Sequence, residues 1–305
     1  MIERFRMPYV IGAVLVMLAA LLWSFDGLLR HSLYSLSPTI IVFFEHLLGA
    51  IIIAPFFIPH RYEGRMFTKN DWLIMGAIAL FSGTLGTLAY TAALGKINFI
   101  PFSVVVLLQQ TQPLFAILLA TLLLKEKLSR YFLKYAALAI VAVYFVSFPN
   151  LKVNLETGGQ TFIAAGLSLI AAFFWGSSTV LSKHILKKAS FVFTTAMRFF
   201  FVVPIALVFV FSTGSQTTLM QISVIQVLTL LAITLSTGLV ALTLYYKGLQ
   251  KIPARRSTIY ELMWPLSAIV LDFVVTGSVL SVTQVIGAAV LIFCMLRITR
   301  YSSRL

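Results

Sequence analysis

Ten long apolar runs separated by short polar loops constrain the fold of this 305-residue chain more than any other feature. A helix that spans a bilayer needs about 20 consecutive apolar residues. Hydrophobic residues make up 60% of the chain and charged residues 10%, whereas soluble domains average about 45–50% and about 25%. We therefore predict an all-α integral membrane protein with ten transmembrane helices, at 9–29, 38–58, 72–92, 101–124, 131–148, 162–181, 191–211, 224–246, 258–276 and 282–296.

Basic residues gather in alternate loops. If the N-terminus lies inside, the inside segments hold 19 Lys and Arg, the outside segments hold Arg30, Lys96 and Lys152, and Arg198 lies within a span. Loops rich in Lys and Arg stay on the cytoplasmic side of a membrane. We expect both termini in the cytoplasm and the chain in the cytoplasmic (inner) membrane. The same pattern explains the net charge of +14 without a nucleic-acid partner.

The chain repeats itself at an offset of 152 residues. This shift aligns Trp23 with Trp175 and Pro113 with Pro265. Each half holds five spans, an odd number, so the second copy must enter the membrane from the opposite side. Inverted repeats of this kind are typical of secondary transporters, whose substrate site lies between the repeats. We predict two inverted five-helix repeats, 1–150 and 151–305, that form one transport unit.

Several segments carry a family resemblance. They are a polar stretch before a proline, Gln109-Gln110-Thr111-Gln112-Pro113, with its acidic and basic end Leu124-Lys125-Glu126-Lys127-Leu128-Ser129; the matching stretch from Glu261 to Pro265; and Trp23-Ser24 and Trp175-Gly176. The pattern resembles the ten-helix EamA type of the drug/metabolite transporter superfamily. The resemblance implies a cavity between the halves and export or uptake of small metabolites.

Glu261 and Pro265 stand out within an apolar run. A charged side chain at bilayer depth costs roughly 2.5–3.5 kcal/mol on insertion scales, which makes it a functional candidate. Pro265 has no N–H, so we expect the carbonyl of Glu261 to lose its helical partner. Glu261 is our candidate for proton coupling or for binding a cationic substrate; the alternative is a structural ion pair with Arg198. Gln109 is the repeat mate of Glu261.

The other candidate substrate-binding residues are polar or aromatic side chains within spans. Glu45 and His46 are adjacent, so we expect them to point about 100° apart and not to face one cavity centre together. Tyr260 and Trp264 are four residues apart, which places them on one helical face. The full set of candidates for substrate binding is Trp23, Glu45, His46, Tyr90, Gln109, Gln112, Trp175, Arg198, Tyr245, Tyr260, Glu261 and Trp264.

Other function classes lack support in the sequence. No phosphate-binding loop of the G-x-x-x-x-G-K-[ST] type is present, so we expect no ATP hydrolysis. Cys294 is the single cysteine, and no His or Cys spacing suggests a metal site. Asp26 and Asp272 fall near the outer ends of their spans, which argues against an intramembrane aspartyl protease. We expect no enzyme activity, no cofactor and no bound metal.

We therefore predict a secondary transporter that moves small polar metabolites by alternating access, coupled to protons through Glu261. Arg198 with Glu261 favours amino acids, because the pair would clamp a zwitterion. The aromatic and acidic surroundings favour choline-like quaternary ammonium or other organic cations instead. A passive facilitator is a third alternative. The expected partners are a small-molecule substrate, the lipid bilayer and protons.

Overall fold

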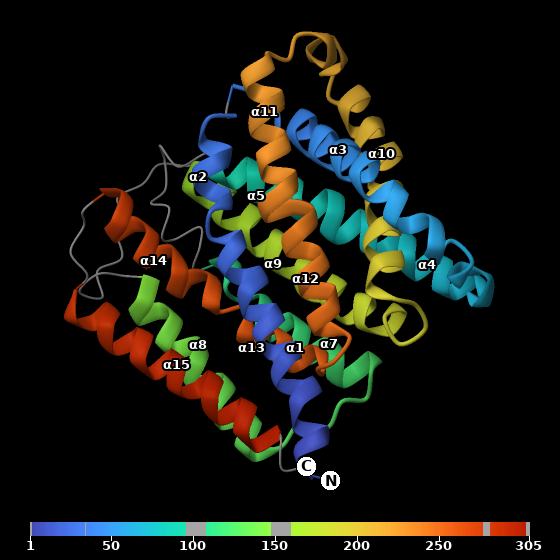
Figure 1. Ribbon diagram of the computed structural model, residues 1–305. Coiled ribbons are helices and arrows are strands. Elements are labelled where there is room, and N and C mark those ends of the chain that lie inside the picture. Colours follow the sequence, from blue (N-terminus) through green and yellow to red (C-terminus); the bar gives the residue numbers. More distant parts are fainter. Residues whose placement is uncertain (1, 34, 96–107, 148–159, 277–280, 303–305) are drawn as a thin grey trace.

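The structure is a computed structural model that describes residues 2–33, 35–95, 108–147, 160–276 and 281–302 (Figure 1). Every regular element among these residues is helical. Six helical stretches, 7–30, 38–60, 69–94, 163–185, 191–212 and 224–249, are long and apolar enough to cross a membrane, and shorter apolar helices accompany them. The prediction of an all-α membrane fold is confirmed.

The helices follow the same order in the two halves of the chain. The first half contains α1 (Ile2–Trp23), α2 (Asp26–His31), α3 (Pro38–Phe57), α4 (Lys69–Ile78), η3 (Ala79–Gly86), α5 (Thr87–Leu94), α7 (Gln112–Leu123) and α8 (Arg130–Ser147). The second half contains α9 (Gln160–Ile185), α10 (Phe191–Ser212), α11 (Val224–Ile233), η6 (Thr234–Gly238), α12 (Leu239–Leu249), α13 (Ala254–Tyr260), α14 (Met263–Thr276) and α15 (Val282–Ser302).

These helices cover the ten predicted spans. The predicted span 72–92 is the run α4, η3 and α5, and the predicted span 224–246 is the run α11, η6 and α12. Residues 101–107 of the fourth predicted span lie outside the described part of the chain. Each half therefore supplies five helical spans, two of which are interrupted at matching places.

The third span of each half is widened by a π-helical segment. The segment in the first half, η3, ends at Gly86, and η6 in the second half ends at Gly238, which is 152 residues further on. The hydroxyls of Thr84 and Thr87 bond back to the carbonyls five residues before them, at 3.2 and 2.9 Å. Such π-bulges occur often at functional sites.

Helices of the two halves alternate in space. In Figure 1, α1 runs beside α12, α3 beside α10 and α8 beside α15, and α7 also packs along α9. Each of these pairs joins one half to the other. Because the halves interleave in this way, the centre of the molecule is built from both of them.

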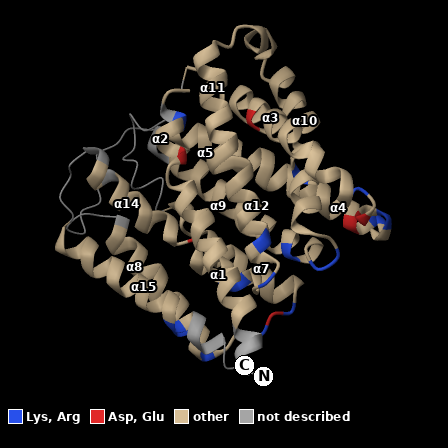
Figure 2. Cartoon of the chain, in the orientation of Figure 1, with Lys and Arg blue, Asp and Glu red and all other residues tan. Residues whose placement is uncertain are grey.

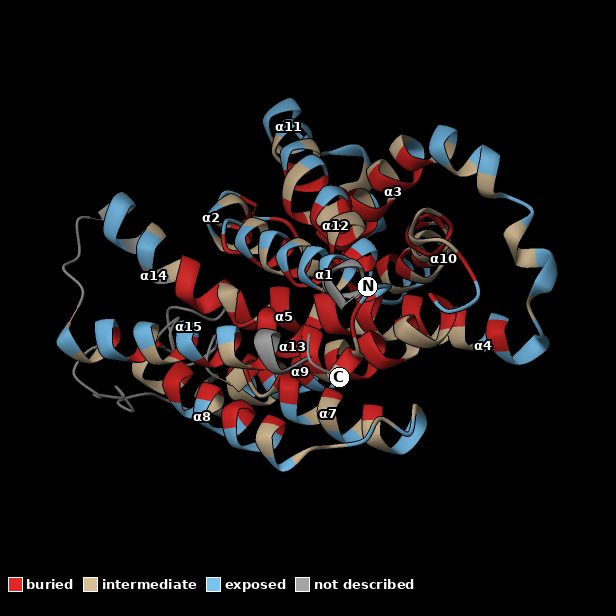
Figure 3. Ribbon diagram, turned by 60° about the horizontal axis from the view of Figure 1, so that its bottom comes forward, coloured by how far each residue is buried: buried red, intermediate tan, exposed pale blue. Residues whose placement is uncertain are grey.

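The outer surface is apolar. Figure 3 shows α5, α9 and α13 buried at the centre and the outward faces of α11, α14 and α15 exposed. Large hydrophobic side chains on these faces, such as Val224, Val274 and Ile286, are more than half exposed. A bilayer would cover them. Lys and Arg gather along the edge that runs from the two termini to the start of α4 (Figure 2).

Two glycines allow a close crossing of α1 and α12, which come from different halves of the chain. A Cβ atom on Gly248 of α12 would lie 2.7 Å from the carbonyl oxygen of Gly12 in α1 and 2.9 Å from Cγ2 of Val16. A Cβ on Gly12 would lie 2.8 Å from Cγ2 of Ile252. Small residues at such crossings let helix backbones approach closely in membranes.

We expect Gly248→Ala to destabilise the protein by about 1–3 kcal/mol, because the new methyl group overlaps the α1 backbone. The measurement is the melting temperature of the purified protein in detergent. Gly76→Ala is the matched control, since a Cβ there meets no atom within 4 Å. An equal decrease in melting temperature for both variants would contradict the close crossing.

Candidate functional site

The ninth span is broken at Glu261. Helix α13 ends at Tyr260, and α14 begins at Met263 after a turn at Glu261 and Leu262. Pro265 cannot donate to the Glu261 carbonyl, as expected, but the carbonyl is not left free, because the amide of Trp264 donates to it at 2.9 Å. Pro265 lies in the first turn of the new helix, where its missing N–H removes no helical bond. The break nevertheless brings the Glu261 side chain to the centre of the bundle.

The fourth span has the same break. The described residues show a turn at Gln110 and Thr111, followed by α7 with Pro113 in its first turn. This break places Gln109 and Gln112 opposite the α13–α14 break. The hydrogen bond from Gln112 Nε2 to Glu261 Oε2, 2.7 Å long, joins the two breaks directly.

A cavity with about 1030 Å³ of empty space, part of it open to solvent, lies between the halves at these breaks. Eleven of the twelve predicted substrate-binding residues line it: Trp23, Glu45, His46, Tyr90, Gln109, Gln112, Trp175, Arg198, Tyr245, Glu261 and Trp264. Both Glu45 and His46 are among them. These adjacent residues, expected to point about 100° apart, thus both belong to the cavity wall.

Tyr260 is the predicted residue that does not line the cavity. Its side chain is fully buried, and its hydroxyl lies 3.0 Å from that of Tyr9 in α1. The shared face predicted for Tyr260 and Trp264 requires a continuous helix, and the chain turns between them.

Uncharged partners surround the Glu261 carboxylate. Tyr245 donates to Oε1 at 2.8 Å and Gln112 donates to Oε2, and the Tyr245 hydroxyl also lies 2.8 Å from that of Thr179. The ion pair with Arg198 does not form among the described residues. Arg198 instead donates to the hydroxyl of Tyr246 at 3.3 Å.

Aromatic rings line the cavity. The rings of Trp23 and Tyr245 lie 5.2 Å apart between centroids, as do those of Tyr90 and Trp175, and Trp264 lies 6.3 Å from Tyr90. The indole N–H of Trp175 donates to a backbone carbonyl in the η3 segment at 3.2 Å. These rings are held in place by their contacts and present flat apolar faces.

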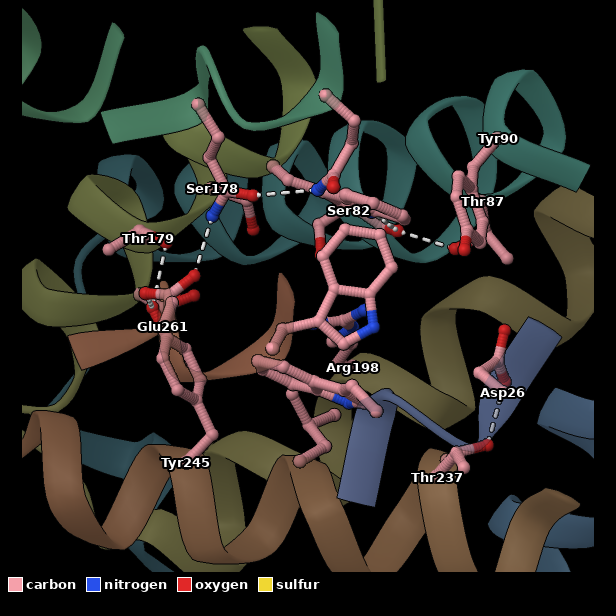
Figure 4. Close-up of a pocket in the computed structure, with 18 of the residues that line it drawn as sticks. Asp26, Ser82, Thr87, Tyr90, Ser178, Thr179, Arg198, Thr237, Tyr245 and Glu261 are labelled. Carbon is pink, nitrogen blue, oxygen red and sulfur yellow. Dashed lines mark hydrogen bonds between the residues drawn. The ribbon is translucent and has the colours of Figure 1, made fainter. Parts of the chain in front are cut away.

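A buried charged cluster lines the cavity, and Figure 4 shows its Asp26 on the side opposite Glu261. Arg30 of α2 donates through Nε to Asp26 and through Nη2 to Glu45, the latter at 2.7 Å. Thr237 of η6 donates to Asp26 Oδ1 at 2.7 Å. Asp26 and Arg30 were expected near the outer face, and the structure places them in the cavity wall with less than a tenth of their surface exposed.

A sequence signal for these two residues did exist. Trp23, Asp26 and Arg30 are spaced three and four residues apart, and all three line the cavity. The offset of 152 carries them onto Trp175, Ser178 and Ser182, which also line it. Four more pairs at this offset line the cavity, namely His46 with Arg198, Tyr90 with Leu242, Gln109 with Glu261 and Gln112 with Trp264.

The sequence profile of the EamA-like transporter family matches residues 10–148 and again residues 162–300. The chain belongs to the EamA-like transporter family. The second match lies 152 residues after the first, which is the offset of the predicted repeat. This membership places the chain in the drug/metabolite transporter superfamily and makes it an integral membrane transporter.

Two relatives match the EamA-like chain along most of its length. The riboflavin transporter ImpX of Fusobacterium nucleatum subsp. nucleatum is 38% identical over 291 residues, which cover 95% of this chain and 97% of that protein. An uncharacterized transporter of Clostridium kluyveri is 24% identical over 289 residues, 92% of this chain and 90% of that protein. A crystal structure that is 16% identical aligns with a TM-score of 0.72 over 96% of this chain and 97% of its own, which shows a shared fold.

Water should enter this cavity, and cysteine labelling tests that. In a Cys294→Ser background, we expect Ser178→Cys to react with a small water-soluble thiol reagent at least about tenfold faster than Ser168→Cys, because reaction requires access. Both serines are buried in the same helix, but Ser178 lines the cavity, whereas Ser168 does not and donates to the Ala164 carbonyl. The readout is the mass of the intact protein against time, and equal rates would contradict a solvent-filled cavity.

Proposed function

We propose that this transporter carries riboflavin or a closely related flavin across the cytoplasmic membrane. The cavity supports this proposal because it combines aromatic faces with amide groups in one wall, which suits a planar heteroaromatic ring. The full-length similarity to a riboflavin transporter points to the same ligand class.

Stacking would hold the ring. Trp23, Tyr90, Trp175, Tyr245 and Trp264 surround the cavity with rings from both halves of the chain. Stacking of a nucleobase on an aromatic side chain contributes about 1–3 kcal/mol, and the larger flavin ring system offers the same kind of face. Saturated metabolites would gain less from this arrangement.

Hydrogen bonds would orient the ring. Gln109 donates to Gln112 at 3.2 Å, and its own Oε1 is buried without a partner among the described residues. Nε2 of the neighbouring Gln110 is likewise buried and unpaired in that part of the chain. An unpaired buried acceptor and donor each cost free energy until a ligand satisfies them. The imide edge of a flavin carries one N–H between two carbonyl groups, so it offers the complementary donor and acceptors.

Transport would proceed by alternating access, with the two repeats rocking about the central cavity. The 19 to 3 distribution of Lys and Arg supports cytoplasmic termini and an inner-membrane location. In Figure 1 the start of α1 and the end of α15 lie at the same end of the molecule, as this orientation requires.

Binding tests this function. We expect riboflavin to raise the melting temperature of the purified protein with concentration, because a ligand that binds the folded state stabilises it by mass action. In proteoliposomes, labelled riboflavin should show saturable counterflow, which a passive channel does not produce. Stabilisation by neither riboflavin nor lumichrome, the ring without its chain, would contradict the proposal.

Amino acids are the second candidate, because Arg198 and Glu261 line the same cavity without pairing to each other. The pair would then receive the carboxylate and the ammonium group of a zwitterion. The same melting screen, with amino acids and choline added, distinguishes these ligands: stabilisation by amino acids alone favours the zwitterion, and stabilisation by choline alone favours an organic cation.

The charges in the cavity support proton coupling through Glu261. Three carboxylates, Asp26, Glu45 and Glu261, and two guanidinium groups, Arg30 and Arg198, line it. One negative charge is therefore in excess, and Glu261 is the carboxylate without a cationic partner among the described residues. Placing an uncompensated charge in apolar surroundings is unfavourable. An uncharged substrate such as riboflavin would leave this charge for a proton to neutralise.

We expect Glu261→Gln to abolish riboflavin accumulation driven by a pH gradient in proteoliposomes, because glutamine cannot exchange a proton. Counterflow without a gradient should persist, since the amide can still bond to Tyr245. Glu126→Gln is the control, because Glu126 pairs with Arg255 outside the cavity. Normal pH-driven accumulation by Glu261→Gln would contradict coupling at this residue.

A further inference from the structure

The charged cluster of Asp26, Arg30 and Glu45 has hydrogen-bonding capacity that the protein leaves unused. Nη1 of Arg30 is buried and has no partner among the described residues, although Nε and Nη2 are both bonded. Glu45 accepts from Arg30 through Oε2, and no bond to its Oε1 forms within the described chain. The bonded pair of Arg30 and Glu45 in the cavity wall therefore keeps one unused donor and one unused acceptor.

The charged cluster and Glu261 occupy different ends of the cavity. Figure 4 shows Glu261 with Tyr245 and Thr179 at one side, Asp26 with Thr237 at the opposite side, and Arg198 between them. The cavity, which aromatic rings also line, thus has Glu261 at one end and the charged cluster at the other. An elongated ligand would meet both ends.

We propose that the charged cluster binds the sugar-alcohol chain of the flavin and excludes a phosphorylated chain. This inference rests on the proposed function, which assigns the ring to the aromatic and amide part of the cavity. Asp26, Arg30 and Glu45 would then set the specificity for the flavin chain at their end of the cavity.

A hydroxyl-rich chain fits the unused groups. Each hydroxyl both donates and accepts, so one can accept from Arg30 Nη1 while a neighbour donates to Glu45 Oε1. Hydrogen bonds to charged groups are the stronger class, about 1.5–3 kcal/mol each when they form in a buried site. A methyl group can neither accept from Arg30 Nη1 nor donate to Glu45. A quaternary ammonium is attracted to the carboxylates, but it cannot accept a hydrogen bond from Arg30 Nη1.

A phosphate does not fit. The cluster holds two carboxylates against one guanidinium group, and both carboxylates already bind that group. A phosphorylated chain would add negative charge beside Asp26 and Glu45, and like charges placed together at a binding site cost several kcal/mol. Repulsion of this kind is a common way to reject a close relative of the true ligand.

The experiment compares three ligands by flavin fluorescence titration of the full-length protein in detergent: riboflavin, lumichrome, and riboflavin 5′-phosphate. Lumichrome lacks the chain and so loses a hydrogen bond to a charged group, whereas riboflavin 5′-phosphate adds a charge that the carboxylates repel. Wild-type protein should therefore bind riboflavin about tenfold or more tightly than either of the other two ligands.

Glu45→Gln should weaken riboflavin binding by about threefold to tenfold, because it replaces a charged acceptor with a neutral one. Lumichrome has no chain, so its Kd should stay at the wild-type value. The preference for riboflavin over its phosphate should shrink, because one repelling charge is gone. Glu63→Gln, the same change outside the cavity, should alter none of the three values; Glu63 bonds to the backbone of Ser190 and to His60.

Thr237→Val is a second variant in case Glu45→Gln does not fold. It removes the donor to Asp26 Oδ1 while keeping the size of the side chain, and it should also weaken riboflavin but not lumichrome. Equal binding of lumichrome and riboflavin to the wild type, or equal weakening of both by the variants, would overturn the inference and leave flavin transport standing. Binding of no flavin would overturn both.

Discussion

Polar groups inside a membrane span need partners from the protein or from a ligand, and the centre of this structure depends on that constraint. Where α13 stops at Tyr260, the carbonyl of Glu261 is taken by the amide of Trp264, and its carboxylate by Gln112 and Tyr245. The Gln112 bond comes from the matching break in the other half. Polar groups at one helix break are therefore hydrogen-bonded partly by side chains from the matching break in the other half. The space between the two breaks is the cavity.

The fold and eleven of the 24 residues that line the cavity could be predicted from the sequence, because both follow from local rules. Span length and the 152-residue offset predict ten helices in two repeats, and charge or polarity within a span predicts Glu45, Gln109, Arg198 and Glu261. Long-range pairing is different. Among the described residues, Arg30 pairs with Glu45, whereas Arg198 does not pair with Glu261. Which of these pairs forms depends on how α2, α3 and α10 cross, and no local sequence pattern encodes those crossings.

Helix ends account for the remaining errors. Asp26 and Arg30 fall at the edge of an apolar run, where a solvated position is the usual outcome, yet α1 ends at Trp23 and α2 carries both residues into the cavity wall. Tyr260 was assigned to the cavity by helical spacing, and the turn at Glu261 breaks that spacing. Beyond a break, residues no longer fall on the helical face that uninterrupted spacing predicts. The residues next to breaks are therefore the hardest to place from sequence.

The described residues that line the cavity include one more carboxylate than guanidinium groups, and this excess negative charge has an electrical consequence. If riboflavin and one proton occupy the proposed site together, the loaded cavity is neutral, and its passage across the bilayer moves no net charge. The empty, deprotonated cavity carries one negative charge back. A membrane potential would then act on the return of the empty carrier rather than on the substrate-loaded step, since moving one charge through 100 mV involves about 2.3 kcal/mol. The voltage-sensitive part of the cycle would thus be the one without substrate.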